Sequence, residues 1–485
     1  MALHSRLASR IPPRRKGARL ASSGQVAVAI SELKALLGGE RVSQVVSTLH
    51  LHGKGESYHK SEPPDAVIFA NSTEEVSNVV ATCAKLQVPI IPFGTGTSLE
   101  GHVAAREGGI CLDLTGMNRI LQVNAEDMDV RVEAGVLRNQ LNDHLRDTGL
   151  FFSVDPGANA SLGGMTACSA SGTTSMRYGT MRENVLGMTV VLASGEVIKV
   201  GGRAKKSSAG YDLRSLMLGS EGTLGVITEI QVRLHGRPAA VCGAVAPFPD
   251  LESAVGAVIE AILMGVPMAR CELLDDVSMA ALNKYNKGMS YPEVPHLFFE
   301  FHGTEASVQE QAQTAEEVCT GSNNALSFNW SSDATKRNQL WDARHNAYYA
   351  ALALRPGSQG HPTDVAVPLS RLAECIVATA DDVKASGIIA PIFGHVGDGN
   401  FHVILSHKRD DPPDLLDRTL QVNERLIRRA LAMGGTCTGE HGVGYGKRKW
   451  LVQEFGQGGV DMMASIKRAL DPLNILNPGK VVSIQ

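Results

Sequence analysis

The pattern of apolar and polar positions predicts a first half in which strands dominate. Residues 66–70 and 88–93 have apolar runs typical of buried strands, and the amphipathic stretch 73–86 between them predicts a helix capped by Thr73. Further elements of this half are predicted as strands at 110–114, 129–133, 187–192, 197–200 and 226–234, and as a helix at 137–148. The first half therefore begins with a βαβ unit and continues mainly as sheet.

From about residue 238 the pattern changes, because helical periodicity now alternates with apolar strands, as in an α+β layer. A strand is predicted at 297–301, and helices are predicted at 251–264, 307–320, 334–354, 371–386, 415–433 and 460–470. We predict a domain boundary near Arg237. Upstream of the first strand, a helical pattern at 31–51 predicts a lead-in segment.

Composition narrows the classes of protein to which this chain can belong. With 485 residues and 43% hydrophobic content, it can bury at least two cores, and its net charge of −4 gives no electrostatic case for nucleic acid. Eight cysteines without a CxxC spacing suggest neither a disulfide framework nor a thiolate zinc site. Because no window of eighteen apolar residues occurs, we expect no transmembrane segment.

The N-terminal residues have the composition of a mitochondrial transit peptide. They include six arginines and lysines before residue 20, several serines, and no acidic residue before Glu32. They lack the long apolar core of a secretory signal, so we assign residues 1–25 to a transit peptide and expect a mitochondrial protein. A disordered basic tail is the alternative.

Three glycine-rich loops adjoin the predicted strands of the first half. GTGTS at 94–98 follows a strand, GSEGTLG at 219–225 precedes one, and residues 155–179 have hardly any large apolar side chains. Small residues let the backbone approach a diphosphate, whereas plain turns and a linker are the structural alternatives. Leu99 stands where a nicotinamide-binding fingerprint would have its third glycine. Together the loops favour backbone held close to one ligand.

Two glycine-rich motifs in the second half carry candidate metal ligands. His395 and His402 lie in FGHVGDGNFHV, where a Gly-Asp-Gly turn would fold them toward one point, and TGEHGVGYGK supplies Glu440 and His441. A lone histidine is more often structural, but imidazole and carboxylate together suit a divalent metal. We predict a metal at His395, His402 and Glu440, with coordination positions open for a substrate and His441 free to act as a base.

Taken in order, these motifs resemble those of the FAD-linked 2-hydroxyacid dehydrogenases of the vanillyl-alcohol oxidase type. The resemblance extends from about Glu62 to the C-terminus, and within the family it is strongest to the mitochondrial branch that oxidises D-lactate. It rests on PFGTGTS, DPGANASLGG, GSEGTLG, GHVGDGNFH, GEHG and NPGK, which begin at residues 92, 155, 219, 394, 439 and 477. The combination is far more specific than any one loop.

The resemblance implies an α+β protein, in which a two-lobed FAD-binding domain of the vanillyl-alcohol oxidase type carries an α+β cap domain. After the transit peptide we assign residues 26–61 to the lead-in, 62–237 to the FAD-binding domain and 238–433 to the cap. Residues 434–485 would form a C-terminal segment that completes the active site and returns to the FAD domain.

The resemblance also implies which residues hold FAD. Some relatives attach the flavin through a histidine in the first loop, but here Leu99 and Glu100 follow Ser98, so we expect non-covalent FAD. The residues expected to bind FAD are Pro92, Gly94, Thr95, Gly96, Thr97, Ser98, Asp155, Pro156, Gly157, Ala158, Gly163, Gly164, Ser169, Gly172, Ser175, Tyr178, Gly179, Glu221, Gly222, Gly225, Ile227 and Asn477.

The implied reaction is the oxidation of D-lactate and related small or apolar D-2-hydroxy acids to 2-oxo acids. The resemblance implies zinc or manganese at the three metal ligands and pairs Arg344 with the substrate carboxylate. The metal would lower the pKa of the 2-hydroxyl, His441 would take its proton, and the C2 hydride would pass to FAD. Cytochrome c is the implied electron acceptor.

The sequence alone leaves other functions open. Sister enzymes act on D-2-hydroxyglutarate or glycolate, and a flavin oxidase would pass electrons to oxygen instead. Tyr348, Tyr349 and Thr363 stand where extra basic side chains would hold a second carboxylate, which favours a substrate with a small or apolar side chain. If the protein were instead a metal-binding scaffold, the glycine loops would be structural and the protein would be colourless.

Overall fold

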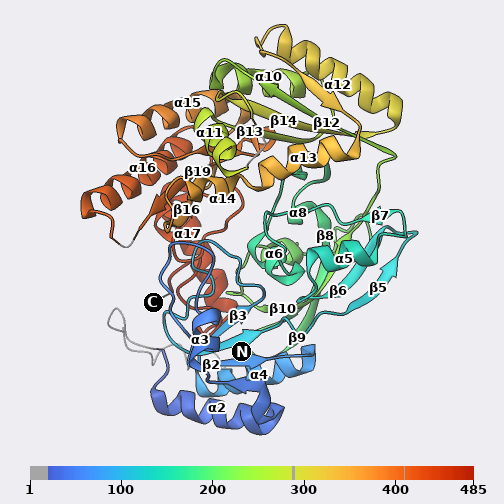
Figure 1. The fold of residues 1–485 in the computed structure, drawn as a ribbon. Helices are drawn as coiled ribbons and strands as arrows, with labels where there is room; N and C mark the ends of the chain where they lie inside the picture. The colour runs from blue at the N-terminus through green and yellow to red at the C-terminus, as the bar shows by residue number, and fades with distance from the viewer. Residues whose placement is uncertain (1–19, 287–289, 409, 485) are drawn as a thin grey trace.

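The protein consists of two bodies, one from each half of the chain (Figure 1). The computed structural model describes residues 20–286, 290–408 and 410–484. The first body, blue to green in Figure 1, contains two sheets of four and five strands, and the second, yellow to orange, is built on an eight-stranded sheet. Within these described residues, no helix has the length and apolar character needed to cross a membrane.

The chain enters the first body through helix α2 (Ser23–Leu37). The Ser22 side chain caps the helix by accepting a hydrogen bond from the Gln25 amide, and Gln25 Oε1 accepts one from the Ser22 amide. Most of the predicted transit peptide, residues 1–19, lies outside the described residues, and α2 begins just before the predicted boundary at residue 25.

The predicted single helix at 31–51 is wrong. Helix α2 ends at Gly38, whose φ of 94° is accessible to glycine and breaks the helical path. The chain then forms strand β1 (Val42–Ser43) and a second short helix, α3 (Val46–His52). The apolar spacing was continuous through the break, so periodicity alone did not show it.

A small, mostly parallel sheet forms the first lobe. Its order is β1-β2-β4-β3, with β4 parallel to both of its neighbours. The elements are β2 (Ala66–Phe69), α4 (Thr73–Leu86), β3 (Ile90–Phe93) and β4 (Ile110–Asp113). The predicted βαβ unit is confirmed, although Ser72 rather than Thr73 caps α4, by accepting from the Glu75 amide.

An antiparallel sheet forms the second lobe, in the order β5-β6-β10-β8-β9. Its strands are β5 (Ile120–Asn124), β6 (Asp129–Glu133), β8 (Val185–Val191), β9 (Val197–Gly201) and β10 (Val226–Arg233). Helix α5 (Arg138–His144) and the short pair β7 (Leu150–Phe151) and β11 (His235–Gly236) flank it. The sequence did not predict β5, which has no fully buried position to mark it.

The glycine-rich stretch 155–179 contains short helices that the sequence did not predict. They are α6 (Leu162–Cys168) and α7 (Ser175–Tyr178), and α8 (Met181–Asn184) follows. Leu162 and Met165 are buried, so α6 is a helix packed inside the body rather than on its surface. Helix α9 (Leu213–Met217) leads to the third glycine-rich loop.

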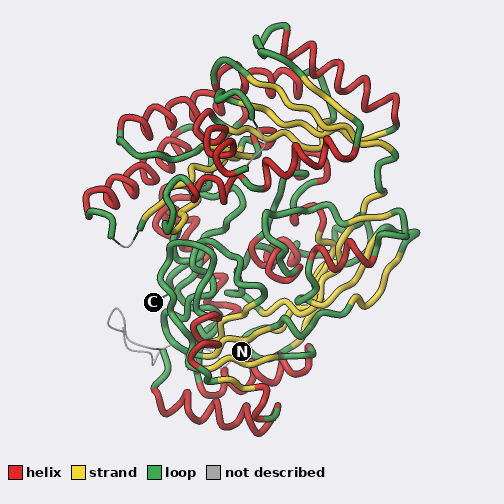
Figure 2. Tube along the Cα trace, viewed as in Figure 1, coloured by secondary structure: helices red, strands yellow, loops and turns green. Residues whose placement is uncertain are grey.

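The sheet of the second body has helices on both faces (Figure 2). Its order is β15-β12-β14-β13-β18-β19-β16, and β17 pairs with β19. The strands are β12 (Ala240–Pro247), β13 (Met268–Leu274), β14 (His296–Gly303), β15 (Asn329–Ser331), β16 (Gln359–Pro362), β17 (Val365–Ala366), β18 (Ile392–Gly394) and β19 (Asn400–His407).

The residues of β14 alternate between two cores. Phe299 and Phe301 pack with one set of helices, and Phe298 packs with the other set. On the first face are α10 (Leu251–Leu263), α12 (Glu305–Thr320), α15 (Leu369–Ala385) and α16 (Pro413–Ala432); on the second are α11 (Asp276–Tyr285), α13 (Ala334–His345) and α14 (Ala347–Ala353). The predicted helix at 334–354 is therefore two helices, which meet at Asn346.

The end of the chain returns to the first body through α17 (Leu451–Leu470), drawn in red in Figure 1. The helix starts earlier than the predicted 460–470, and its backbone is kinked at Gly456. Beyond it, the amide of Ile90 in β3 donates to Ile475 O at 2.7 Å. Ile475 and Leu476 thereby join the core of the first body.

Lys467 anchors this return. Its side chain is buried, and Nζ donates to Thr223 O and Leu476 O, each at 2.7 Å, and to Asp471. Lys467→Met should leave the buried Asp471 carboxylate without its charged partner and remove a donor from two carbonyls, and should lower the free energy of unfolding by about 3–5 kcal/mol. Denaturant unfolding would measure the loss. Arg468→Met, at the exposed neighbour, is the control, and equal stability of the two variants would contradict this role.

Candidate active site

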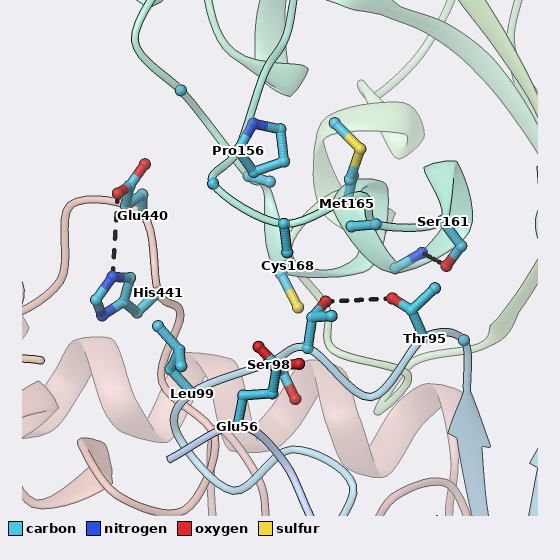
Figure 3. A pocket seen from close by; sticks show the side chains of 18 of the residues that line it. Glu56, Thr95, Ser98, Leu99, Pro156, Ser161, Met165, Cys168, Glu440 and His441 are labelled. Carbon is cyan, nitrogen blue, oxygen red and sulfur yellow. Dashed lines mark hydrogen bonds and ion pairs between the residues drawn. The ribbon is translucent and has the colours of Figure 1, made fainter. Parts of the chain in front are cut away.

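One cavity of about 860 Å³ brings together the glycine loops and the predicted metal ligands. Residues of the first body, including 94–98 and 155–161, line one side, and Arg344, His395 and His402 line the other. Figure 3 shows Thr95, Ser98 and Ser161 in the same view as Glu440 and His441. The volume lies within the range of roughly 300–1,000 Å³ that is usual for ligand sites.

Most of the residues predicted to bind FAD line this cavity. They are Pro92, Gly94, Thr95, Gly96, Thr97, Ser98, Asp155, Pro156, Gly157, Ala158, Gly163, Gly164, Gly172, Glu221, Gly222, Gly225, Ile227 and Asn477. Ser169, Ser175, Tyr178 and Gly179 do not line it. The hydroxyl of Tyr178 instead lies 2.7 Å from Nδ1 of His302 in β14, whereas Ser175 Oγ accepts from the Gly172 amide. Tyr178 thus contacts the second body, and Ser175 bonds within the loop.

The first glycine loop fits closely against the second. A Cβ at Gly94 would lie 2.3 Å from Ser161 Oγ, and one at Gly96, where φ is 71°, would lie 2.8 Å from the Phe93 ring. Only glycine therefore permits this approach. The hydroxyl of Ser98, which lines the cavity, is buried without a hydrogen-bond partner. An unsatisfied hydroxyl beside exposed loop backbone fits a polar ligand such as a diphosphate.

Glu221 and Asn477 line the cavity but use their polar atoms to hold the C-terminal segment. The Glu221 carboxylate accepts from the amides of Val443 and Gly444 at 2.7 and 2.8 Å. Asn477 Nδ2 donates to Glu221 O at 2.7 Å and to His102 O at 3.2 Å. These contacts fix the position of the GEHG motif against the first body.

Strand pairing brings His395 and His402 together. His402, in β19, pairs with Phe393 of β18, and the connecting residues form a turn that closes at Gly399 with φ of 76°. A Cβ at Gly399 would lie 2.2 Å from Val367 O, so this turn requires glycine. The ring centroids of the two histidines are 5.6 Å apart.

The hydrogen bonds of the two imidazoles direct their free nitrogens toward Glu440. His395 Nδ1 lies 2.6 Å from Glu272 Oε1, and His402 Nδ1 lies 2.8 Å from Thr363 O, so both Nδ1 atoms act as donors. Each Nε2 lies 3.2 Å from Glu440 Oε1. Two nitrogen lone pairs and a carboxylate oxygen thus meet in one largely buried place, which fits a metal cation.

The charges around this cluster also favour an added cation. Burial alone would lower the pKa of His395, but Glu272 and Glu440 raise it well above its usual value. Burial would raise the pKa of Glu440, but His395 and His402 lower it well below its usual value. The cluster therefore attracts positive charge, either protons or a metal ion.

The loop that carries Glu440 is held from both sides. Ser171, from the first body, donates to Glu440 Oε2 at 2.6 Å. Asp364 accepts from the amides of Glu440 and His441 at 3.0 and 2.9 Å and from Thr438 Oγ1 at 2.7 Å. Asp364 also lies close enough to His402 and His441 to form a second possible ligand set, but its oxygens are already occupied. It is therefore a positioning residue, which the sequence did not reveal.

His441 lies beside this cluster. Its ring stacks on that of His402, with centroids 5.0 Å apart and planes 5° from parallel. Burial lowers the pKa of His441 to about 4, so the ring is neutral near pH 7. It lines the cavity, and its Nε2 lies 3.9 Å from Glu440 Oε1. Figure 3 shows the two side chains facing each other.

Arg344 lies in the cavity wall, with its guanidinium 4.9 Å from the Phe393 ring centroid. Its Nε and Nη2 donate to Glu272 Oε2 at 2.8 and 2.7 Å, which leaves the Nη1 edge for another partner. A second arginine in the lining, Arg270, was not expected from the sequence. It is paired with Asp155 at 3.0 Å and lies 3.6 Å from Glu300.

Comparison with known proteins gives close relatives over nearly the whole chain. Residues 64–201 match the family described as "FAD binding domain", and 237–481 match "FAD linked oxidases, C-terminal domain". A Danio rerio protein named "Probable D-lactate dehydrogenase, mitochondrial" is 49% identical over 96% of this chain and 93% of its own length. An Arabidopsis thaliana protein named "D-lactate dehydrogenase [cytochrome], mitochondrial" is 43% identical over 93% of this chain and 80% of its own.

A solved structure shows the same fold at low sequence identity. The 4-ethylphenol oxidase from Gulosibacter chungangensis superposes with a TM-score of 0.78 at 21% identity, covering 95% of this chain and 98% of the oxidase. The predicted fold class is thereby confirmed. Because the sequence matches extend over both halves of the chain, this protein belongs to the FAD-linked oxidases of the vanillyl-alcohol oxidase type.

Proposed function

We propose that this protein is a FAD-dependent dehydrogenase that oxidises D-lactate and related small D-2-hydroxy acids to 2-oxo acids. The observation that carries the proposal is the single cavity in which the glycine loops face His395, His402 and Glu440, with Arg344 beside them. The choice of D-lactate as substrate is supported by the names of two relatives, which are 49% and 43% identical to this chain.

FAD would lie along the loops at 94–98 and 155–164, where the close backbone and the unpartnered Ser98 hydroxyl suit its diphosphate. When bound, it supplies an acceptor for the C2 hydride. The loop at 94–98 contains neither histidine nor cysteine, which supports non-covalent binding.

His395, His402 and Glu440 would hold zinc or manganese, with positions open for the substrate. The ion would lower the pKa of a 2-hydroxyl group placed beside it. Arg344 would pair through its free edge with the substrate carboxylate and so orient the C2 hydrogen. His441, neutral because of its burial, would accept the hydroxyl proton.

The cavity beside Arg344 supports a small or apolar substrate side chain. Phe393, Ile404 and Pro362 line it, and Tyr348 and Tyr349 lie at the same wall. A dicarboxylate would need a second free cation. Arg270, which lines the same cavity, is already paired with carboxylates. To pair with Arg270, the distal carboxylate of D-2-hydroxyglutarate would have to break an existing ion pair.

We further propose that electrons leave the flavin for cytochrome c and that the protein acts in mitochondria. The name of the Arabidopsis relative includes the words "cytochrome" and "mitochondrial". The basic, acid-free composition of residues 1–25 supports the same location.

Reduction of the bound flavin by substrate tests the proposed function. In purified protein under anaerobic conditions without nicotinamide, D-lactate should bleach the visible flavin absorbance at least about tenfold faster than L-lactate, because only one isomer presents its C2 hydrogen to the flavin. Addition of oxidised cytochrome c should restore the absorbance. A colourless protein, or a yellow one that neither isomer reduces, would overturn the proposal.

His402→Ala tests the metal site. The variant should keep FAD but lose the bound metal and at least about 100-fold in kcat/KM for D-lactate, since the Lewis acid contributes several kcal/mol. Elemental analysis and steady-state kinetics would measure the two effects. His407→Ala, on the same strand but outside the cavity, should retain both metal and turnover. Full activity of a metal-free sample would refute a metal-assisted reaction.

Asp364→Asn tests the positioning of the proton acceptor. The asparagine NH2 group would face amides that now donate hydrogen bonds to the carboxylate. Because two donors cannot pair, the loop with Glu440 and His441 should shift. We expect kcat to fall about 10–100-fold while FAD remains bound. Asp382→Asn, which removes a carboxylate paired with Arg425 far from the cavity, is the control. An unchanged kcat in Asp364→Asn would remove this residue from the site.

A further inference from the structure

Glu272 is a carboxylate with no exposed surface that joins two parts of the candidate active site. It lies in β13, which pairs with β18 so that Leu273 is opposite Gly394, and this register places Glu272 beside His395. Oε1 accepts from His395 Nδ1 at 2.6 Å. Oε2 accepts from Arg344 Nε and Nη2 at 2.8 and 2.7 Å.

Each oxygen of this carboxylate therefore serves one functional group. One fixes the imidazole that would hold the metal, and the other fixes the guanidinium that would hold the substrate carboxylate. Arg344 Cζ lies 4.9 Å from the centroid of the Phe393 ring, and this contact further limits the movement of the guanidinium. Glu272 does not line the cavity, so it acts only through these two partners.

We infer that Glu272 is a positioning residue that sets the distance between the metal site and Arg344, and thereby restricts the substrate to acids with the hydroxyl on the carbon next to the carboxylate. This inference rests on the proposed function. In a 2-hydroxy acid the two polar groups are on adjacent carbons. In a 3-hydroxy acid one more carbon separates the hydroxyl from the carboxylate. A metal site and an Arg344 guanidinium held at a fixed distance therefore suit only the 2-hydroxy acid.

The chemistry of the bridge explains why a carboxylate is needed. A free arginine side chain has several rotatable bonds and could follow a longer substrate, but a two-point ion pair holds its fork in one place. Glutamine would offer one oxygen and one NH2 group, so either His395 or Arg344 would face another donor. Aspartate would keep the charge but would be one methylene too short to reach both partners.

The test compares Glu272→Gln and Glu272→Asp with the wild-type holoenzyme. Three quantities are measured: the affinity of the chelator-treated protein for zinc or manganese, and kcat and KM for both D-lactate and D-3-hydroxybutyrate. The flavin spectrum of each variant verifies that it is folded.

We expect Glu272→Gln to bind the metal about 10–100-fold more weakly, because altering a residue that holds a metal ligand usually lowers metal affinity by this factor. KM for D-lactate should rise more than kcat falls, because Arg344 loses its orientation. The preference for D-lactate over D-3-hydroxybutyrate in kcat/KM should shrink at least about tenfold. Glu272→Asp should lie between the wild type and Glu272→Gln on each measure.

Glu300→Gln is a matched control. Glu300 is also buried, lies on the neighbouring strand β14, and contacts an arginine and a histidine, Arg270 and His302, but neither partner of Glu272. It should keep wild-type metal affinity and wild-type preference between the two acids. If Glu272→Gln behaves like this control, or if the control behaves like Glu272→Gln, the inference is overturned.

The design separates this inference from the proposed function. A wild-type protein that oxidises neither acid would overturn the proposed function and, with it, the claim about substrate length. Metal affinity would still decide whether Glu272 positions His395, because that measurement does not require turnover.

Discussion

Two imidazole nitrogens that meet at one carboxylate oxygen form the constraint on which the rest of the structure depends. The Nε2 atoms of His395 and His402 both lie 3.2 Å from Glu440 Oε1. Groups that carry lone pairs or negative charge can share a largely buried place only if a cation joins them and the surroundings hold each one in position. The second body supplies the histidines, the C-terminal segment supplies Glu440, and the first body supplies Ser171, which holds it. The site therefore exists only where three parts of the chain meet.

Behind this cluster lies a set of buried carboxylates that each fix a different part of it. Glu272 holds a strand histidine and an arginine, Asp364 holds the loop of Glu440 and His441, and Glu221 holds the amides that follow this loop. Each accepts donors from residues distant in sequence. These contacts explain how a glycine-rich loop, which would otherwise be mobile, can present its side chains with fixed geometry.

The extent to which sequence could predict this arrangement depends on whether the cause is local. The spacing of His395 and His402 around Gly399 is local, since the turn and the strand register follow from neighbouring residues. Glu272 and His395 are 123 residues apart, and only the pairing of β13 with β18 brings them together, so an isolated glutamate in an apolar strand gave no signal. The prediction of one helix at 31–51 was wrong for a different reason. The cause was local, a break at Gly38, but the apolar spacing continued through it and gave no sign of the break. Likewise, glycine content marked 155–179 as a ligand loop but could not show that α6 and α7 turn some of its residues away from the cavity.

The cost of burying these carboxylates argues that they serve chemistry rather than stability. Removing a charged group from water costs several kcal/mol, which pairing repays only when the geometry is good, and apolar residues of similar volume often give equal or greater stability. Glu272 and Asp364 have no exposed surface, and each is surrounded by polar or charged partners that are themselves largely buried. The partners of Glu272 are two groups expected to touch metal or substrate, and those of Asp364 include the backbone amides of Glu440 and His441. A fold under selection for stability alone would fill these positions with leucine or phenylalanine, whereas a site that must hold two anchors and a proton acceptor at fixed distances requires charged groups that resist displacement.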